Sequence, residues 1–365
     1  MTRDACNTPD PAVPPARRET VLPLGPESPW LAPLAGFSDL PFRLLCRENG
    51  AAVACTEMVS AKGLIYGLRQ KKKEPGGTEE LLSTTPEDSP LVVQLFGEDA
   101  DFVARATEEL MARGFAWFDL NMGCAVPKVT KTGAGAALLK DPEQALAVAA
   151  ALFKSAGPGR AGCKLRLGWD ADHPVYLDLA RRLEDAGAAW ITLHPRFARQ
   201  GFGGAADLAA LERLARAVGI PVLASGDLFS AEDGLRRLDT GVAGVMFARG
   251  AMANPAVFRQ YLSMYKKRNS PDSSGGQPAP DALAAGELLR LIRRHAELAR
   301  ALTPGKPGRA GLAPALLKMR TVVPRYVRHL PGSKRLRLAL TRCEGWNELD
   351  AMLRDFFQGN THEVE

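Results

Sequence analysis

The chain of 365 residues is 46% hydrophobic and 24% charged, the composition of an ordinary globular protein with room for a large domain and a smaller one. It has no apolar run long enough to cross a bilayer, so we expect no membrane segment. Its six cysteines form no Cys-x-x-Cys pair and no His/Cys ligand spacing, which argues against a structural metal and fits a reducing cytoplasm.

The net charge of +6 is unevenly distributed. Residues 285–365 hold 15 Lys and Arg against 8 Asp and Glu, whereas the rest of the chain is close to neutral. A basic region of this kind favours a polyanionic partner. A solvated, charged helical surface is the alternative.

Residues 1–28 are rich in proline and charge and lack the apolar core of a secretion signal, which predicts a disordered leader. From Trp30 onward, short apolar runs alternate with amphipathic stretches. The expected strands are 30–35, 52–58, 91–96, 116–122, 162–167, 190–194, 221–224 and 242–248. The expected helices are 40–48, 100–113, 142–154, 174–186, 206–218 and 230–238. This alternation predicts an α/β fold, a closed (β/α)8 TIM barrel over residues 29–265, with an open doubly wound sheet as the alternative.

The pattern changes after the barrel. Residues 266–283 are hydrophilic and rich in Gly, Ser and Pro, which predicts a linker. Residues 284–358 then form a small all-α domain, with helices expected over 284–302, 312–329, 333–340 and 346–357. Two segments of this domain, 318–320 and 334–337, are dense in positive charge.

Polar and small residues gather at or just past the carboxyl ends of the predicted strands, which form the catalytic face of such a barrel. The candidates are Pro33, Leu34, Ala35, Gln94, Asn121, Cys124, Lys164, Arg166, His194, Arg196, Ser225, Gly226, Asp227, Ala248 and Arg249. Small residues at the last two strand ends are typical of a phosphate cradle, to which Arg249 would add a bidentate contact. Lys164 lies within an apolar strand, so it needs a counter-anion or an electron-rich ligand.

Cys124 follows a buried strand and begins a loop that also carries Lys128, Lys131 and a run of small residues. A thiol in such a setting is accessible to a ligand. The alternative is a core cysteine beside a turn.

Several segments resemble the tRNA-dihydrouridine synthases, FMN-dependent reductases of transfer RNA. They are residues 32–43 (APLAGFSDLPFR), 56–58 (TEM), 93–97 (VQLFG), 119–124 (DLNMGC), 164–169 (KLRLGW) and 193–196 (LHPR). The resemblance spans roughly residues 30–258 and extends into the helical tail. The Asp-x-Asn-Met-Gly-Cys motif is most similar to that of one bacterial subgroup.

The resemblance implies an FMN-binding barrel and a tRNA-binding helical domain. The residues that would hold FMN are Pro33, Leu34, Ala35, Gln94, Lys164, His194, Ser225, Gly226, Asp227, Ala248 and Arg249. Those that would contact the substrate are Asn121, Arg166 and Arg196. The implied reaction saturates the C5=C6 bond of a uridine, with NADPH or NADH as reductant and Cys124 as the proton donor at C5. We expect a cytoplasmic monomer without a metal.

The chain departs from the usual family pattern at three positions, with Ser225, Ala248 and Ala125 where Asn, Gly and Pro are common. Two other functions are compatible with the sequence. One is a flavin barrel that acts on a small molecule, in the manner of dihydroorotate dehydrogenases, which would not need a basic tail. The other is an RNA-binding module without a functional cofactor site.

Overall fold

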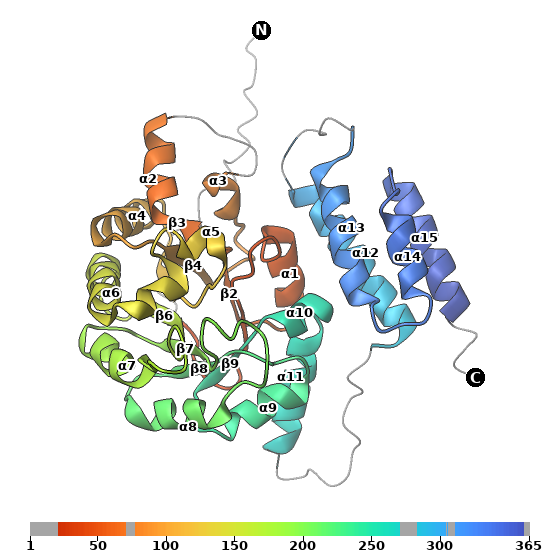
Figure 1. Ribbon diagram of the computed structural model, residues 1–365. Coiled ribbons are helices and arrows are strands. Elements are labelled where there is room, and N and C mark those ends of the chain that lie inside the picture. Colours follow the sequence, from red (N-terminus) through yellow and green to blue (C-terminus); the bar gives the residue numbers. More distant parts are fainter. Residues whose placement is uncertain (1–20, 71–76, 271–282, 304, 306–310, 361–365) are drawn as a thin grey trace.

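The computed structural model describes residues 21–70, 77–270, 283–303, 305 and 311–360 (Figure 1). Its parallel strands form a sheet in the order β2-β1-β9-β8-β7-β6-β5-β4-β3, and an additional pairing of β2 with β4 closes the ring. The strands are β1 (Trp30–Leu31), β2 (Val53–Cys55), β3 (Val59–Ser60), β4 (Leu91–Phe96), β5 (Trp117–Met122), β6 (Ala161–Arg166), β7 (Ile191–His194), β8 (Val222–Ala224) and β9 (Gly244–Phe247). The predicted TIM barrel is confirmed, and the open sheet is excluded.

Helices cover the outside of this barrel (Figure 1). Those near their predicted positions are α1 (Leu40–Glu48), α4 (Ala100–Ala112), α6 (Pro142–Ala156), α7 (Tyr176–Asp185), α8 (Leu208–Ala217) and α9 (Ala231–Leu238). The sequence did not predict α2 (Ala61–Gln70), α3 (Thr78–Leu81), α5 (Pro127–Thr130), the 3-10 helix Gly135–Lys140, α10 (Arg249–Ala253) or α11 (Val257–Arg268). Because α11 continues to Arg268, the first residues of the expected linker are helical; residues 271–282 lie outside the described ranges.

The first strand is shorter than predicted because the chain turns directly after it. The backbone N–H groups of Phe37 and Ser38 both donate to the carbonyl of Leu34, at 2.8 and 2.9 Å. Residues 33–39 therefore form a loop at the carboxyl end of β1, and Asp39 caps α1 by accepting a hydrogen bond from the N–H of Phe42.

Aromatic side chains fill the end of the barrel opposite that loop. The rings of Trp30 and Trp190 are fully buried and 5.6 Å apart. Leu22 packs with them, and the indole N–H of Trp30 donates to the carbonyl of Pro23. The leader was expected to continue to residue 28. The structure differs here, because residues 22–26 already pack on the barrel; residues 1–20 are not among those described.

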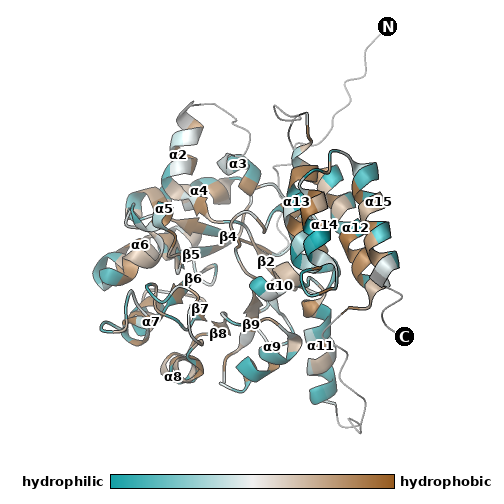
Figure 2. Ribbon diagram, turned by 45° about the vertical axis from the view of Figure 1, so that its right-hand side comes forward, coloured by the Kyte–Doolittle hydropathy of each residue, from teal (hydrophilic) through white to brown (hydrophobic). Residues whose placement is uncertain are grey.

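The helical domain consists of α12 (Ala285–Leu302), α13 (Pro314–Tyr326), α14 (Ser333–Leu340) and α15 (Trp346–Asn360). Hydrophobic segments of α12 and α13 contrast with the hydrophilic α14 in Figure 2. The core of this domain continues into the barrel, because Leu40, Leu44 and Leu45 of α1 pack within it. None of the helices in the described ranges combines the length and the apolar character needed to cross a membrane.

Candidate active site

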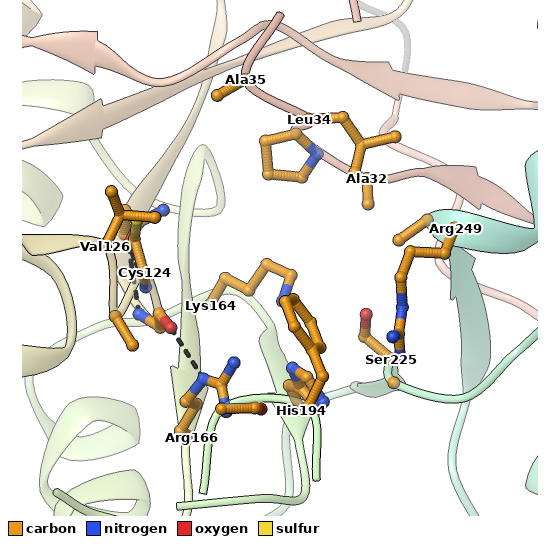
Figure 3. A pocket seen from close by; sticks show the side chains of 18 of the residues that line it. Ala32, Leu34, Ala35, Cys124, Val126, Lys164, Arg166, His194, Ser225 and Arg249 are labelled. Carbon is orange, nitrogen blue, oxygen red and sulfur yellow. Dashed lines mark hydrogen bonds between the residues drawn. The ribbon is translucent and has the colours of Figure 1, made fainter. Parts of the chain in front are cut away.

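A cavity of about 460 Å³ opens at the carboxyl ends of the barrel strands (Figure 3). Its size is that of a typical small-molecule site. All the predicted site residues line it except Gln94 and Arg196. The sequence alone therefore identified most of the residues that line the cavity.

The loop that carries Cys124 lies at one side of the cavity and is fixed by hydrogen bonds from within the barrel. The side-chain oxygen of Asn121 accepts from the N–H groups of Cys124, at 2.9 Å, and Gly123, at 3.2 Å. The guanidinium of Arg166 donates to the carbonyl of Gly123 at 2.8 Å. The carbonyl of Cys124 accepts from the N–H of Ala136. The loop is thus held at three points although Ala125 stands where a proline is common.

Asn121 is itself held by a chain of buried side chains. Its amide nitrogen donates to Gln94 at 2.7 Å, and the amide nitrogen of Gln94 donates to Asp119 at 2.7 Å. The chain ends in a carboxylate, which accepts, and begins at backbone N–H groups, which donate, so the orientation of both amides is determined. The side chain of Gln94 is fully buried and does not line the cavity, so its role in cofactor binding stays a prediction.

Lys164 projects into the middle of the cavity (Figure 3). It makes no hydrogen bond or ion pair with any residue that the structure describes. Burial, and the nearby Arg166, lower its pKa to about 8, while Asp119 opposes this shift. An unpaired, partly desolvated cation at this place attracts an anionic or electron-rich ligand.

Arg166 lines the cavity, but its guanidinium donates hydrogen bonds to backbone carbonyls of the protein. Besides Gly123, it donates to the carbonyls of Phe197 and Gly201, at 3.0 and 2.9 Å. Burial and the charge of Arg196 lower its pKa to about 10, so it stays charged at neutral pH. Arg166 therefore connects the Cys124 loop to the loop that follows β7.

His194 is a neutral imidazole. Burial, followed by the charges of Lys164 and three arginines, holds its pKa far below the usual range. Its Nε2 lies 3.2 Å from a guanidinium nitrogen of Arg196, which can only donate. The ring proton of His194 is consequently on Nδ1.

Arg196 does not line the cavity, and its role as a substrate contact stays a prediction. Only 2% of the residue is exposed. Besides His194, the guanidinium donates to both carboxylate oxygens of Asp227 and to the carbonyls of Gly203 and Gly204. Because every donor has a partner, Arg196 holds the turn at Asp227 in place.

The turn at residues 225–227 follows β8 and lines the cavity together with Arg249. Gly226 has a φ of +89°, and a Cβ there would lie 2.3 Å from the ring of His194, so only glycine fits. Asp227 accepts from Arg249 at 2.9 Å. The guanidinium of Arg249 lies between two aromatic rings, 4.3 Å from the centroid of Phe202 and 4.8 Å from that of Phe229.

Phe202, Phe229 and Arg237 were missed by the sequence reasoning. The phenylalanines lie in loops after β7 and β8 and line the cavity although both are exposed. Arg237 is a buried residue of α9 that donates to the carbonyls of Gly226 and Asp227, at 3.3 and 3.2 Å. Arg237 could have been found from the sequence, because it is a charged residue on the apolar face of the amphipathic helix α9.

Taken together, the fold and the cavity define a (β/α)8-barrel enzyme with a cofactor-sized site at the carboxyl ends of its strands and an appended helical domain. The sequence matches the family described as Dihydrouridine synthase (Dus) over residues 30–358. The chain therefore belongs to the dihydrouridine synthase family and is an oxidoreductase.

Relatives with this description cover most of the chain. A probable tRNA-dihydrouridine synthase of Mycobacterium tuberculosis is 34% identical over 88% of this chain and 80% of its own length. The tRNA-dihydrouridine synthase B of Xanthomonas campestris is 30% identical over 90% of this chain and 92% of its own. A probable tRNA-dihydrouridine synthase of Treponema pallidum is 37% identical over 63% and 69%. The family expected from the sequence is confirmed, and the bacterial subgroup stays a prediction.

Proposed function

We propose that the protein is an FMN-dependent tRNA-dihydrouridine synthase that reduces the C5=C6 bond of uridines in tRNA, with NADPH as reductant, in the cytoplasm. One observation carries this proposal. A single cavity places the Cys124 loop on one side, the turn at Ser225 and Arg249 on the other, and Lys164 between them (Figure 3).

The residues around the turn fit the phosphate of FMN. Arg196 and Arg249 both donate to the carboxylate of Asp227, and Arg237 donates to the backbone carbonyl of the same residue, so three guanidinium groups gather around one carboxylate and leave an excess of positive charge. The bare backbone of Gly226 allows close approach of a phosphate. Lys164 and His194, which lie between the turn and the Cys124 loop, would face the isoalloxazine ring. FMN held here would supply the hydride for C6 of the uracil, with NADPH as the source of electrons.

Cys124 supplies the proton. Free thiols are mostly protonated at neutral pH, so a cysteine beside the substrate can act as a general acid. The S–H bond breaks as the C5–H bond forms, and the thiolate that remains takes up a proton from solvent.

The helical domain offers a surface for tRNA. Lys334, Arg335, Arg337 and Arg342, on α14 and the turn after it, are exposed, and none forms an ion pair with a described residue. Free cations on one surface suit the phosphate backbone of RNA. These contacts would offset the few kcal/mol needed to swing a uridine out of its stack and into the cavity.

A direct assay tests the proposal. The purified protein is incubated with FMN, NADPH and an unmodified tRNA transcript, and the RNA is digested and analysed by mass spectrometry. We expect a uridine to gain two hydrogens, only when FMN and NADPH are both present. If the protein binds FMN but forms no dihydrouridine in any tRNA tested, a small-molecule substrate would be favoured instead.

A further inference from the structure

Residues 33–39 form a loop with two faces. Pro33, Leu34 and Ala35 line the cavity. The following residues, Gly36 to Asp39, turn away from it toward α13 of the helical domain. One short loop thus contacts both the candidate cofactor site and the second domain.

The peptide groups on either side of Gly36 are held by two residues of opposite charge. Its N–H donates to a carboxylate oxygen of Glu57 at 2.5 Å. Its carbonyl accepts from the ammonium of Lys318 at 2.5 Å. Glu57 follows β2 in the barrel, whereas Lys318 belongs to α13. Gly36 has a φ of +76°, which other L-residues rarely adopt, so this conformation of the loop depends on glycine and on its two partners.

Lys318 makes a second contact with the same loop. Its ammonium lies 2.8 Å from the carboxylate of Asp39, the residue that caps α1. The ring of Phe37 is covered by the guanidinium of Arg325, 4.4 Å from its centroid, and by Lys318 at 5.5 Å. Two cations of α13 therefore fix the loop from outside the barrel.

Lys318 is not a free cation for RNA, although the sequence placed it in a basic segment. Only 18% of its side chain is exposed, and its ammonium is engaged by Gly36 and Asp39. Its positive charge also acts on two carboxylates. It pairs with Asp39, and it lowers the pKa of Glu57, which burial and the negative charge of Asp39 raise. A neutral residue at this position would leave Glu57 and Asp39 without the cation that they share.

We propose that Lys318 is a positioning residue of the cofactor site: it reaches from the helical domain and fixes the loop whose residues 33–35 form one wall of the cavity. The affinity of the barrel for FMN then depends on the docked helical domain. This inference rests on the proposed function, because it takes the cavity to bind FMN.

Two measurements on the full chain test it. The first is amide hydrogen exchange of residues 34–38 in the protein without FMN, and the second is FMN affinity from the quenching of flavin fluorescence. The variant is Lys318→Met, with Lys318→Gln as its replacement if the methionine variant does not fold. The control is Arg294→Ala, which removes another ion pair between the domains, that with Glu48 of α1, and leaves the loop untouched.

We expect Lys318→Met to weaken FMN binding about tenfold and to speed exchange in the loop by a similar factor, because a hydrogen bond from a charged donor is lost. Arg294→Ala should change neither by more than about twofold, and Lys318→Arg should restore most of both. Equal effects of Lys318→Met and Arg294→Ala would overturn the inference, as would unchanged exchange and affinity in Lys318→Met. Failure of the wild-type protein to bind FMN would instead contradict the proposed function, and the exchange measurement would still decide whether Lys318 holds the loop.

Discussion

The two loops that meet at the cavity are held in opposite ways. The Cys124 loop is fixed from inside the barrel, through Asn121, Arg166 and the start of the 3-10 helix. The loop at residues 33–39 is held from two sides, by Glu57 of the barrel and, from outside the barrel, by Lys318 of α13. The thiol that we propose as the proton donor thus belongs to the barrel, whereas one wall of the proposed cofactor site is tied to the domain that we propose binds RNA.

This difference predicts different effects for substitutions inside the barrel and for substitutions at the domain interface. Changes inside the barrel should alter the chemistry or the stability of the whole fold, because the groups concerned are buried. Changes at the domain interface should alter cofactor affinity without removing the proton donor.

Cys124→Ala should lower the rate of tRNA reduction about 100-fold to 10,000-fold, the range typical of a lost general acid. FMN should still bind, since the phosphate end of the cavity is untouched. Single-turnover kinetics with pre-reduced protein and tRNA would measure the effect. Reduction at the wild-type rate would show that another group is the acid.

Gln94→Leu breaks the buried chain that orients Asn121. It leaves the carboxylate of Asp119 and the amide of Asn121 without their partner, so we expect a loss of about 3 kcal/mol in the free energy of unfolding. Denaturation in urea measures it. The matched control is Gln144→Leu at an exposed glutamine, whose one side-chain hydrogen bond, to the carbonyl of Glu98, can be replaced by water, so we expect a loss of no more than about 1 kcal/mol. Similar changes in the two variants would mean that the chain does not stabilise the fold.

Lys164 predicts a pH dependence of stability in the protein without FMN. Its pKa is lowered from 10.5 to about 8 in the folded state, so between these values the unfolded chain binds more protons. The contribution of Lys164 to the free energy of unfolding therefore rises as the pH increases from about 8 toward 10.5.

Lys164→Met removes that contribution. The free energy of unfolding of the wild type, minus that of the variant, should therefore increase as the pH is raised from 7 to 10. At pH 7 the comparison should favour the variant most. Urea denaturation of both proteins at a series of pH values would measure the difference. A difference that does not vary with pH would contradict the desolvation of Lys164.

The free cations of α14 should affect RNA and not the cofactor. Replacing Lys334 and Arg337 by Ala should reduce the slope of log affinity for tRNA against log salt by about 0.7 to 0.9 per cation that contacts a phosphate. FMN affinity should stay at the wild-type value, in contrast to Lys318→Met. An unchanged salt slope would place the RNA surface elsewhere.

The sequence predicted the barrel because its signals are local. The helix Leu40–Glu48 was predicted to the residue, since Asp39 precedes it and Pro41 lies in its first turn. Beyond the first two strands, the carboxyl ends were predicted to within one residue, because apolar runs stop at polar or small residues. Most of the residues around the cavity followed, because the carboxyl ends of barrel strands meet at one face.

What the sequence did not reveal depends on contacts between distant residues. Gln94 and Arg196 lie at strand ends like their neighbours, yet their partners, Asp119 and Asp227, draw them below the surface of the cavity. Lys318 belongs to a basic segment, and its contacts with Gly36 and Asp39, far away in the sequence, show that it is not free. Spacing along the chain carries no information about such pairs.

The central claim is that a uridine of tRNA is reduced at this cavity with Cys124 as the acid. The most direct test is to map dihydrouridine in tRNA from cells that lack the gene and from the same cells that express the wild type or Cys124→Ala. We predict at least one position that is dihydrouridine with the wild type and uridine both in the deletion and with Cys124→Ala. Identical dihydrouridine maps in all the strains would contradict the account.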